Sequence, residues 1–298
     1  MNRLLLVDGH NLLFRMFYGM PDNFYTPLGR KYNAVYGFAS AMKKVISLIR
    51  PTHAIVVFDS PDCGDRRKLD EAYKANRPDF SDAAPEDCPF TQLPAIYAML
   101  DEMQIPHREI HGCEADDVIA SYAMTCARYF HVVIFSTDRD YWQLISENVS
   151  ILDYHGMDST LITPPTVEKK FGVKPEQFAD FKCLLGDPSD NIAGVPGVGP
   201  KRAAELLGRY GTLENLLLHT DEIERPSVRK ALEESRERLE LNNRLIRLCP
   251  HAELPLEPAY LAFRARIPSN PMTLAMELAD EYYEENKRGG EEHGKIFI

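Results

Sequence analysis

The sequence lacks the features that would place the chain in a membrane or in an oxidising compartment. No apolar run approaches the roughly 20 residues of a membrane span, and the run "LLLV" after Arg3 meets Asp8 before it could serve as a signal-peptide core. The six cysteines contain no C-x-x-C pair, so they form neither a zinc motif nor a dense disulfide framework. We therefore expect a cytoplasmic protein with reduced cysteines and no membrane partner.

The chain also lacks an excess of basic residues, since its net charge is -11. Affinity for phosphates comes largely from lysine and arginine, so this total argues at first against a nucleic-acid partner. Net charge is only a sum, however, and sites for divalent cations need carboxylates. With 298 residues, of which 44% are hydrophobic, the chain is long and apolar enough for a sizeable core.

Short apolar runs alternate with helical patterns in the first half of the chain. The apolar runs predict strands at 3–8, 53–59, 105–110 and 131–138, and the helical patterns cover 34–49, 91–103 and 115–130. This alternation predicts an α/β domain with a central, mostly parallel sheet flanked by helices. A second, mostly helical region begins near Pro164, and the acids and glycines of residues 280–298 predict a frayed tail.

Carboxylates follow the ends of these predicted strands. They are Asp8, Asp59, Asp138 and Asp140, together with Glu114, Asp116 and Asp117 after the short strand. Because ligands bind at the carboxyl ends of parallel strands, we expect these seven acids to converge at one sheet edge. Each acid alone could be a helix cap or turn former, and the "EADD" cluster could simply complement a helix dipole. Seven carboxylates in one cleft would repel one another strongly unless cations were bound.

The donor set of this predicted cleft suggests which cations it would bind. Oxygen ligands without histidine or cysteine pairs favour magnesium or manganese over zinc. Two such ions can activate water and stabilise the leaving oxygen of a phosphodiester. The acids therefore predict phosphoryl-transfer chemistry.

Residues 186–202, "GDPSDNIAGVPGVGPKR", add Asp187 and Asp190 and then a glycine-punctuated turn that leads into a helix. The glycines allow close approach of the backbone to a ligand, and the helix N-terminus presents free N–H groups to an anion. These glycines are Gly194, Gly197 and Gly199, and the first helical turn carries Lys201 and Arg202. A DNA phosphate would satisfy all these groups, whereas the alternative is a structural turn between two helices. The spacing of a nucleotide-binding P-loop is absent.

This ordered series of motifs resembles the 5′ nuclease family, which includes the N-terminal nuclease domain of bacterial DNA polymerase I, stand-alone bacterial relatives, and flap endonucleases. The similarity runs from "LLLVDGHNLLFR" through "YKANRP", "EADDVIA" and "STDRD" to "GDPSDNIAGVPGVGPKRAAELL", covering about residues 3–255. It implies a PIN-like or resolvase-like nuclease core over 1–163 with a helical arch at about 64–98. A helical DNA-binding subdomain would follow at 164–255, with a helix-three-turn-helix at about 186–210, and then a partly flexible extension at 256–298.

The resemblance also implies roles for individual residues. The first metal ion would be held by Asp8, Asp59, Glu114 and Asp116, and the second would be surrounded by Asp138, Asp140, Asp187 and Asp190. Asp117 would lie between them as a catalytic residue. Lys74 and Arg66 would contact the scissile phosphate, and Arg15 would lie near the substrate. The implied cofactors are two Mg²⁺ or Mn²⁺ ions, with a K⁺ ion held by main-chain carbonyls of the helix-three-turn-helix.

The implied arch would carry a cationic face. At about 100° per residue, a helix would align its basic and aromatic residues in one stripe about 120° wide. These residues are Arg66, Arg67, Tyr73, Lys74 and Arg77. Such a face offers charges to phosphates and a ring to bases, as a single strand requires. The alternative is an ordinary solvated charged face, since Asp70 lies in the same stripe.

We therefore predict a structure-specific 5′–3′ exonuclease and flap endonuclease that acts as a monomer and leaves a 5′ phosphate and a 3′ hydroxyl. The expected substrates are DNA with a 5′ flap, a 5′ overhang or a recessed 5′ end, and RNA–DNA hybrids. Two alternatives remain open. A non-catalytic relative that binds branched DNA would gain nothing from nine acids near phosphates, and a PIN-like ribonuclease normally lacks the glycine-rich subdomain.

Overall fold

The computed structural model describes residues 2–60 and 65–283. The fold is built around a six-stranded sheet with the strand order β3-β2-β1-β4-β5-β6. The strands are β1 (Asn2–Asp8), β2 (His53–Phe58), β3 (His107–Glu109), β4 (Phe130–Phe135), β5 (Val149–Asp153) and β6 (Thr160–Ile162). Every neighbouring pair is parallel except β5 and β6. The predicted mostly parallel sheet is therefore confirmed, with β5 and β6 added at one edge.

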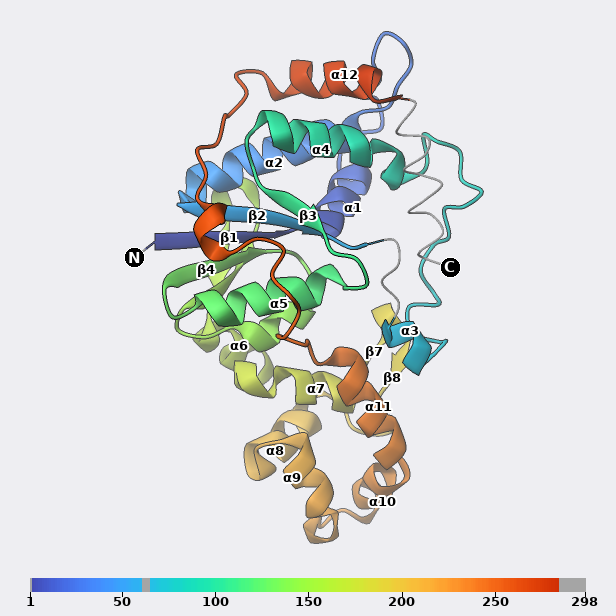
Figure 1. Ribbon diagram of the computed structural model, residues 1–298. Helices are drawn as coiled ribbons and strands as arrows, with labels where there is room; N and C mark the ends of the chain where they lie inside the picture. Colours follow the sequence, from blue (N-terminus) through green and yellow to red (C-terminus); the bar gives the residue numbers. More distant parts are fainter. Residues whose placement is uncertain (1, 61–64, 284–298) are drawn as a thin grey trace.

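Helices cover both faces of this sheet (Figure 1). One face carries α1 (Gly9–Gly19), α2 (Asn33–Ile49), α4 (Leu93–Glu102) and α12 (Pro271–Glu281), and the other carries α5 (Ala115–Cys126) and α6 (Pro164–Phe171). Side chains of the central strand β1 alternate between the two layers, as a strand's geometry requires. Leu5 and Val7 pack with the α2 side, whereas Leu4 and Leu6 pack with the α5 side. This two-sided burial explains the continuous apolar run at 3–8.

Helix α12 was not predicted, since residues 256–298 were expected only to form a partly flexible extension. The helix packs against α2 and α4, and the Thr26 hydroxyl donates a hydrogen bond to Asp280 at 2.6 Å. Its buried residues Ala275, Leu278 and Ala279 recur at helical spacing. The part of the predicted frayed tail from residue 284 onward lies outside the described residues.

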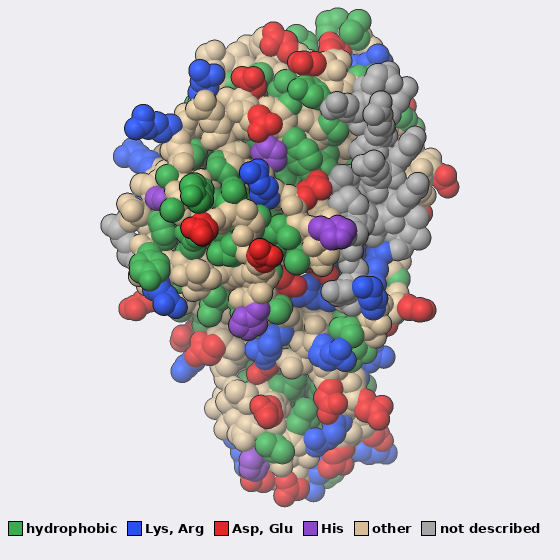
Figure 2. All heavy atoms as spheres, in the orientation of Figure 1, with side chains coloured by type: hydrophobic (Ala, Val, Ile, Leu, Met, Phe, Trp, Pro, Cys, Tyr) green, Lys and Arg blue, Asp and Glu red, His purple; other side chains and the backbone are tan. Residues whose placement is uncertain are grey.

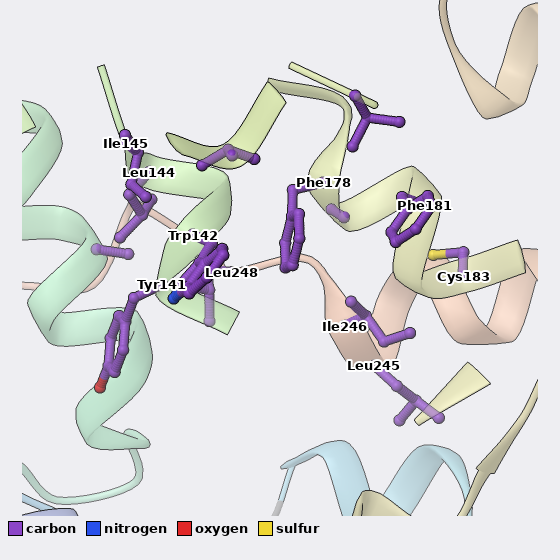
Figure 3. Close-up of a cluster of buried hydrophobic side chains, with 14 of the residues drawn as sticks. Tyr141, Trp142, Leu144, Ile145, Phe178, Phe181, Cys183, Leu245, Ile246 and Leu248 are labelled. Atoms are coloured by element: carbon purple, nitrogen blue, oxygen red, sulfur yellow. The ribbon is translucent and has the colours of Figure 1, made fainter. Parts of the chain in front are cut away.

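The second region is helical, as predicted, and is joined to the sheet domain by a shared apolar cluster. It contains α7 (Phe178–Leu185), α8 (Pro200–Tyr210), α9 (Leu213–Leu218), α10 (Pro226–Glu234) and α11 (Arg236–Ile246). Trp142 packs against Phe178, and Ile246 and Leu248 belong to the same buried cluster (Figure 3). On the face in Figure 2, acidic and basic side chains are interspersed over this lower part of the molecule.

The prediction of one continuous helical face over residues 66–77 was wrong. Within the described part of 64–98, α3 (Asp65–Leu69) has only five residues, and turns follow from residue 71 to 76. Lys74 has a left-handed backbone (φ 57°), which a continuous helix does not permit. Tyr73 and Arg66 are buried rather than exposed. The physical reason is electrostatic, because the cations of this segment turn inward and pair with carboxylates, as described below.

The structure bears on two expectations from the sequence, which concern membrane spans and the state of the cysteines. Among residues 2–60 and 65–283, no helix has both the length and the apolar character needed to cross a bilayer. The five described cysteines are free thiols, of which Cys88, Cys126 and Cys183 are buried and Cys249 is exposed. Cys63 lies outside the described residues.

Candidate active site

A first group of carboxylates meets at the carboxyl edge of the sheet. Asp8, Asp59, Asp116 and Asp138 line a cavity of about 260 Å³, together with Lys74 and Arg77. Asp8 ends β1 and caps α1, where it accepts a hydrogen bond from the Asn11 N–H at 3.0 Å. Asp59 follows β2 and accepts a bond from the Ala115 N–H at 2.7 Å, which ties it to the start of α5. Four of the seven acids expected at this sheet edge therefore line one cavity.

A buried tyrosine connects two of these acids. The Tyr141 hydroxyl donates to Asp116 Oδ1 at 2.5 Å and lies 3.3 Å from Asp8 Oδ2. Ser136 donates a second hydrogen bond to Asp8 Oδ2 at 2.9 Å. Figure 3 shows that the Tyr141 hydroxyl points away from the apolar cluster around Phe178. Tyr141 and Ser136 therefore orient carboxylates without adding charge.

A second group of carboxylates lies beside the first. Carboxylate oxygens of Asp140, Asp187 and Asp190 lie within 4.8 Å of one another, a spacing that could hold a metal ion. Asp187 and Asp190 line a further cavity of about 560 Å³, and Asp138 borders both cavities. Asp138 caps the 3-10 helix η2 (Arg139–Leu144) and accepts a bond from the Asp140 N–H at 2.8 Å. Asp138 therefore links the two groups of acids.

Crowding and burial perturb the protonation of these acids. Burial, followed by repulsion from Asp59, raises the pKa of Asp8 to about 6. Burial and the neighbouring Asp138 and Asp8 raise the pKa of Asp116 well above its usual value. Burial and Asp138 raise the pKa of Asp140 to about 7 even though a lysine opposes the shift. Without further cations, the ionised forms of Asp8, Asp116 and Asp140 are therefore unfavourable. Asp59 differs, because His10 and Lys74 lower its pKa despite burial.

Cations of the chain itself pair with the remaining acids. The Arg66 guanidinium lies 2.8 Å from Glu114 and 2.7 Å from Asp117, and Lys74 Nζ lies 3.3 Å from Glu114. The attraction of Glu114 raises the pKa of Lys74 despite burial, which alone would lower it. Asp117 also accepts a bond from the Cys249 N–H at 2.8 Å. In this structure Glu114 and Asp117 therefore hold the cations, while neither borders the 260 Å³ cavity.

Three polar residues of the site were not predicted from the sequence. Lys182 on α7 pairs with Asp140 and lies 2.6 Å from Asp187. His10 Nδ1 accepts a hydrogen bond from the Asp59 N–H at 2.9 Å. Tyr141 is the third. His10 and Tyr141 lie two residues from Asp8 and one residue from Asp140, so proximity to strand-end acids was the available signal, whereas Lys182 had none.

The basic residues predicted for DNA binding are placed in different surroundings. Arg15 donates to the Tyr154 carbonyl at 2.6 Å and covers its ring, and Arg77 pairs with Asp190 at 2.9 Å. The buried Tyr73 ring lies 4.8 Å from Lys74 Nζ. Arg67 is half-buried on α3. Of these, only Arg77 borders the acid-lined cavities.

The glycine-rich segment forms the connection between α7 and α8. A Cβ atom on Gly194 would approach the Leu185 backbone to 2.2 Å, so this glycine is required by the packing of the chain itself. Gly197 has φ +77°, and a Cβ atom there or on Gly199 would meet nothing within 4 Å. Lys201 is exposed, and Arg202 pairs with Glu205 at 2.9 Å in the first part of α8. The backbone around Gly197 and Gly199 is thus open to a ligand.

Known proteins share this fold and these motifs. The family model for the 5′-3′ exonuclease N-terminal resolvase-like domain matches residues 3–172, and that for the 5′-3′ exonuclease C-terminal SAM fold matches residues 173–268. These matches describe a resolvase-like domain followed by a SAM fold. More specifically, the chain belongs to the 5′-3′ exonuclease family.

Two curated relatives illustrate how the family is organised. The 5′-3′ exonuclease of Aquifex aeolicus is 37% identical over 257 residues, which cover 86% of this chain and 85% of the relative. The thermostable DNA polymerase I of Thermus thermophilus is 41% identical over 256 residues. That match covers 86% of this chain but only 29% of the polymerase. The chain therefore spans less than a third of this polymerase relative.

Solved structures share the fold at lower identity. Zinc-bound T5 5′-exonuclease is 22% identical with a TM-score of 0.69, and the match covers 97% of this chain and all of that one. The catalytic core of Rad2 in complex with a DNA substrate is 15% identical with a TM-score of 0.60, covering 97% of this chain and 90% of that one. These likenesses support the two-part fold.

Replacing Tyr141 with phenylalanine is expected to reduce divalent-metal affinity by about 10- to 100-fold, because the hydroxyl that orients Asp8 and Asp116, two of the acids expected to hold an ion, is lost while the buried ring is kept. Titration calorimetry with Mn²⁺ measures this directly. Tyr129→Phe, at a ring that is 68% exposed, is the matched control. Unchanged Mn²⁺ affinity in Tyr141→Phe would show that the hydroxyl does not orient Asp8 and Asp116.

Proposed function

We propose that the chain is a 5′–3′ exonuclease and flap endonuclease that hydrolyses DNA phosphodiesters with two divalent ions, Mg²⁺ or Mn²⁺. The observation that carries this proposal is the meeting of strand-end carboxylates from separate segments in one cavity that also contains Lys74. The core at 1–163 would perform the chemistry, and the helical subdomain at 164–255 would bind duplex DNA. We further propose that the protein acts as a monomer in the cytoplasm.

The donor set fits such ions. All candidate ligands are carboxylates, which hard divalent cations prefer, and the raised pKa values of Asp8 and Asp140 arise from burial and repulsion that added positive charge would relieve. The first ion would be held by Asp8, Asp59 and Asp116, joined by Glu114 once it releases Arg66 and Lys74, and the second by Asp138, Asp140, Asp187 and Asp190. When bound, such ions supply an activated water and neutralise charge on the phosphate.

The chain's own cations would act on the substrate. Water attacks phosphorus, the bond to the 3′ oxygen breaks, and that oxygen takes up a proton, which leaves a 3′ hydroxyl and a 5′ phosphate. Lys74 borders the cavity, where its ammonium group would stabilise the developing negative charge. Arg66 would assist once phosphate competes for it with Glu114 and Asp117. The carboxylate of Asp117 would then keep Arg66 oriented.

The remaining predicted contacts concern DNA on either side of the site. The duplex backbone would be bound by the open turn at Gly197 and Gly199 and by the start of α8, which carries Lys201 and Arg202. Main-chain carbonyls of this segment would bind a K⁺ ion. Gly194 would support this turn through its packing against Leu185. Arg67 and Arg77 would contact the single-stranded 5′ end of a flap, an overhang or a recessed end, including RNA–DNA hybrids, and buried Tyr73 would support their segment. Arg15 would contact the same strand from α1.

Digestion of a 5′-labelled flap tests the proposal. We expect short labelled products in Mg²⁺ or Mn²⁺ and none in EDTA, and product length reports the cleavage position. An RNA duplex of the same sequence serves as the control for a PIN-like ribonuclease. If no flap product forms with either ion, or if only the RNA is cut, the proposed function is wrong.

A further inference from the structure

The turn that carries Lys74 is attached to the loop between α7 and α8, which carries Asp187 and Asp190 of the second group of acids. The Lys74 N–H donates to the Asp190 carbonyl at 3.0 Å. Asn191 Nδ2 donates to the Ala72 carbonyl at 2.9 Å, and Asn76 Nδ2 donates in the opposite direction to the Pro188 carbonyl at 3.0 Å. Two side-chain amides, one from each segment, thus clamp the two pieces of backbone together.

Backbone conformation shows that this attachment maintains an unfavourable turn. Lys74 has φ 57° and Asn191 has φ 59°, both in the left-handed region. Asparagine tolerates this region, whereas for lysine it is uncommon and strained, so the surroundings must impose it. The Asp190 carbonyl accepts from the strained residue itself, and the two amides bond on either side of it. The clamp is therefore placed to impose the conformation of Lys74.

The conformation of this turn decides where the Lys74 ammonium group lies. The side chain extends past the Tyr73 ring to within 3.3 Å of Glu114 and borders the cavity lined by Asp8 and Asp116. A relaxed right-handed turn would rotate the Cα–Cβ bond of Lys74 and withdraw its ammonium group. Neither asparagine borders either acid-lined cavity, so neither contacts the reacting groups directly. Because both also hold the loop that carries Asp187 and Asp190, metal affinity has to be measured beside the rate to separate an effect on Lys74 from one on these acids.

We propose that Asn76 and Asn191 are positioning residues that lock the Lys74 turn onto the loop between α7 and α8. This inference rests on the proposed function, in which Lys74 acts on the scissile phosphate. The same loop continues into the open backbone at Gly197 and Gly199. Duplex DNA held there would therefore meet a preset Lys74, which makes cleavage depend on correct seating of the duplex.

Two substitutions remove the clamp without introducing strain. Asn191→Gly keeps the left-handed backbone and deletes only the amide, and Asn76→Ala deletes the reciprocal amide. Each is expected to lower the single-turnover rate of flap cleavage in Mg²⁺ by about tenfold, because small misplacements of a reacting group are costly. The Kd for the flap in EDTA and the Mn²⁺ affinity should be unchanged. Asn215→Ala, which removes an amide-to-carbonyl bond to Tyr210 in the same subdomain, should cleave at the wild-type rate.

A Lys74→Ala background separates this inference from the proposed function. If the asparagines act through Lys74, Asn191→Gly should cause no further loss in that background. A full additional loss, or an unchanged rate in the single variants, would overturn the inference while Lys74→Ala itself remained slow. A wild-type rate in Lys74→Ala would instead refute the proposed role of Lys74. Hydrogen exchange of residues 70–77 should quicken in Asn191→Gly, and unchanged exchange would show that no clamp exists.

Discussion

Asp116→Ala is expected to slow cleavage of a 5′ flap in Mg²⁺ by about a thousandfold or more, because charge stabilisation at the reacting phosphate is lost. Asp116 borders the cavity with Asp8, Asp59 and Asp138 and is held there by the Tyr141 hydroxyl. Affinity for DNA should be retained or improved, since a negative charge near the phosphates is removed. A large loss of rate without loss of binding distinguishes chemistry from recognition.

Single-turnover cleavage and fluorescence anisotropy with the same flap measure the two quantities. Asp221→Ala, at an exposed position on the helical subdomain, is the control for loss of an ordinary aspartate. The pKa of Asp116 is raised by burial, Asp138 and Asp8, so the metal-free variant should also be at least as stable as the wild type. A wild-type cleavage rate would remove Asp116 from the reaction, and a lost fold would show in thermal unfolding.

The strand-end acids could be predicted because a parallel sheet brings the carboxyl ends of its strands to one edge. Asp8, Asp59 and Asp138 each end or follow a strand whose apolar run was visible in the sequence, and all three border one cavity. Asp187 was found from its glycine-rich context. These predictions needed only local pattern and sheet topology.

Other parts of the site depend on packing that no local pattern records. Lys182 lies on a helix whose orientation toward Asp140 is set by the apolar cluster around Trp142 and Phe178 (Figure 3). The prediction of a helical stripe over residues 66–77 was wrong for a related reason. Periodicity treats charges as solvated, whereas Arg66 and Lys74 pair with half-buried carboxylates at the start of α5. Long-range electrostatics therefore overrode the local helical pattern.

The metal-free protein is expected to lose stability as the pH rises from 5 to 8. An unfolded aspartate releases its proton near pH 3.8, whereas folded Asp8 retains it to about pH 6 and Asp140 to about pH 7. Between these values the folded state binds more protons than the unfolded state, so the free energy of unfolding falls with rising pH. The two groups together account for a loss on the order of 3 to 4 kcal/mol over this range. Asp187 has the opposite effect below pH 4. Lys182 lowers its pKa despite burial, so its contribution to the free energy of unfolding is lost as the pH falls.

Urea unfolding in EDTA at pH 5, 6, 7 and 8 measures this slope, and the same series in Mg²⁺ provides the comparison. Bound divalent ions favour the ionised carboxylates, so Mg²⁺ should restore stability most at pH 8 and least at pH 5. Asp8→Asn should flatten the slope in EDTA by removing the titration of Asp8, whereas Asp221→Asn should leave the slope intact. A flat profile in wild-type protein, or an unaltered slope in Asp8→Asn, would show that the buried carboxylates are already neutralised by Lys74, Arg77 and Lys182. The site would then need no added ions to fold, and any metal requirement would belong to the chemical step alone.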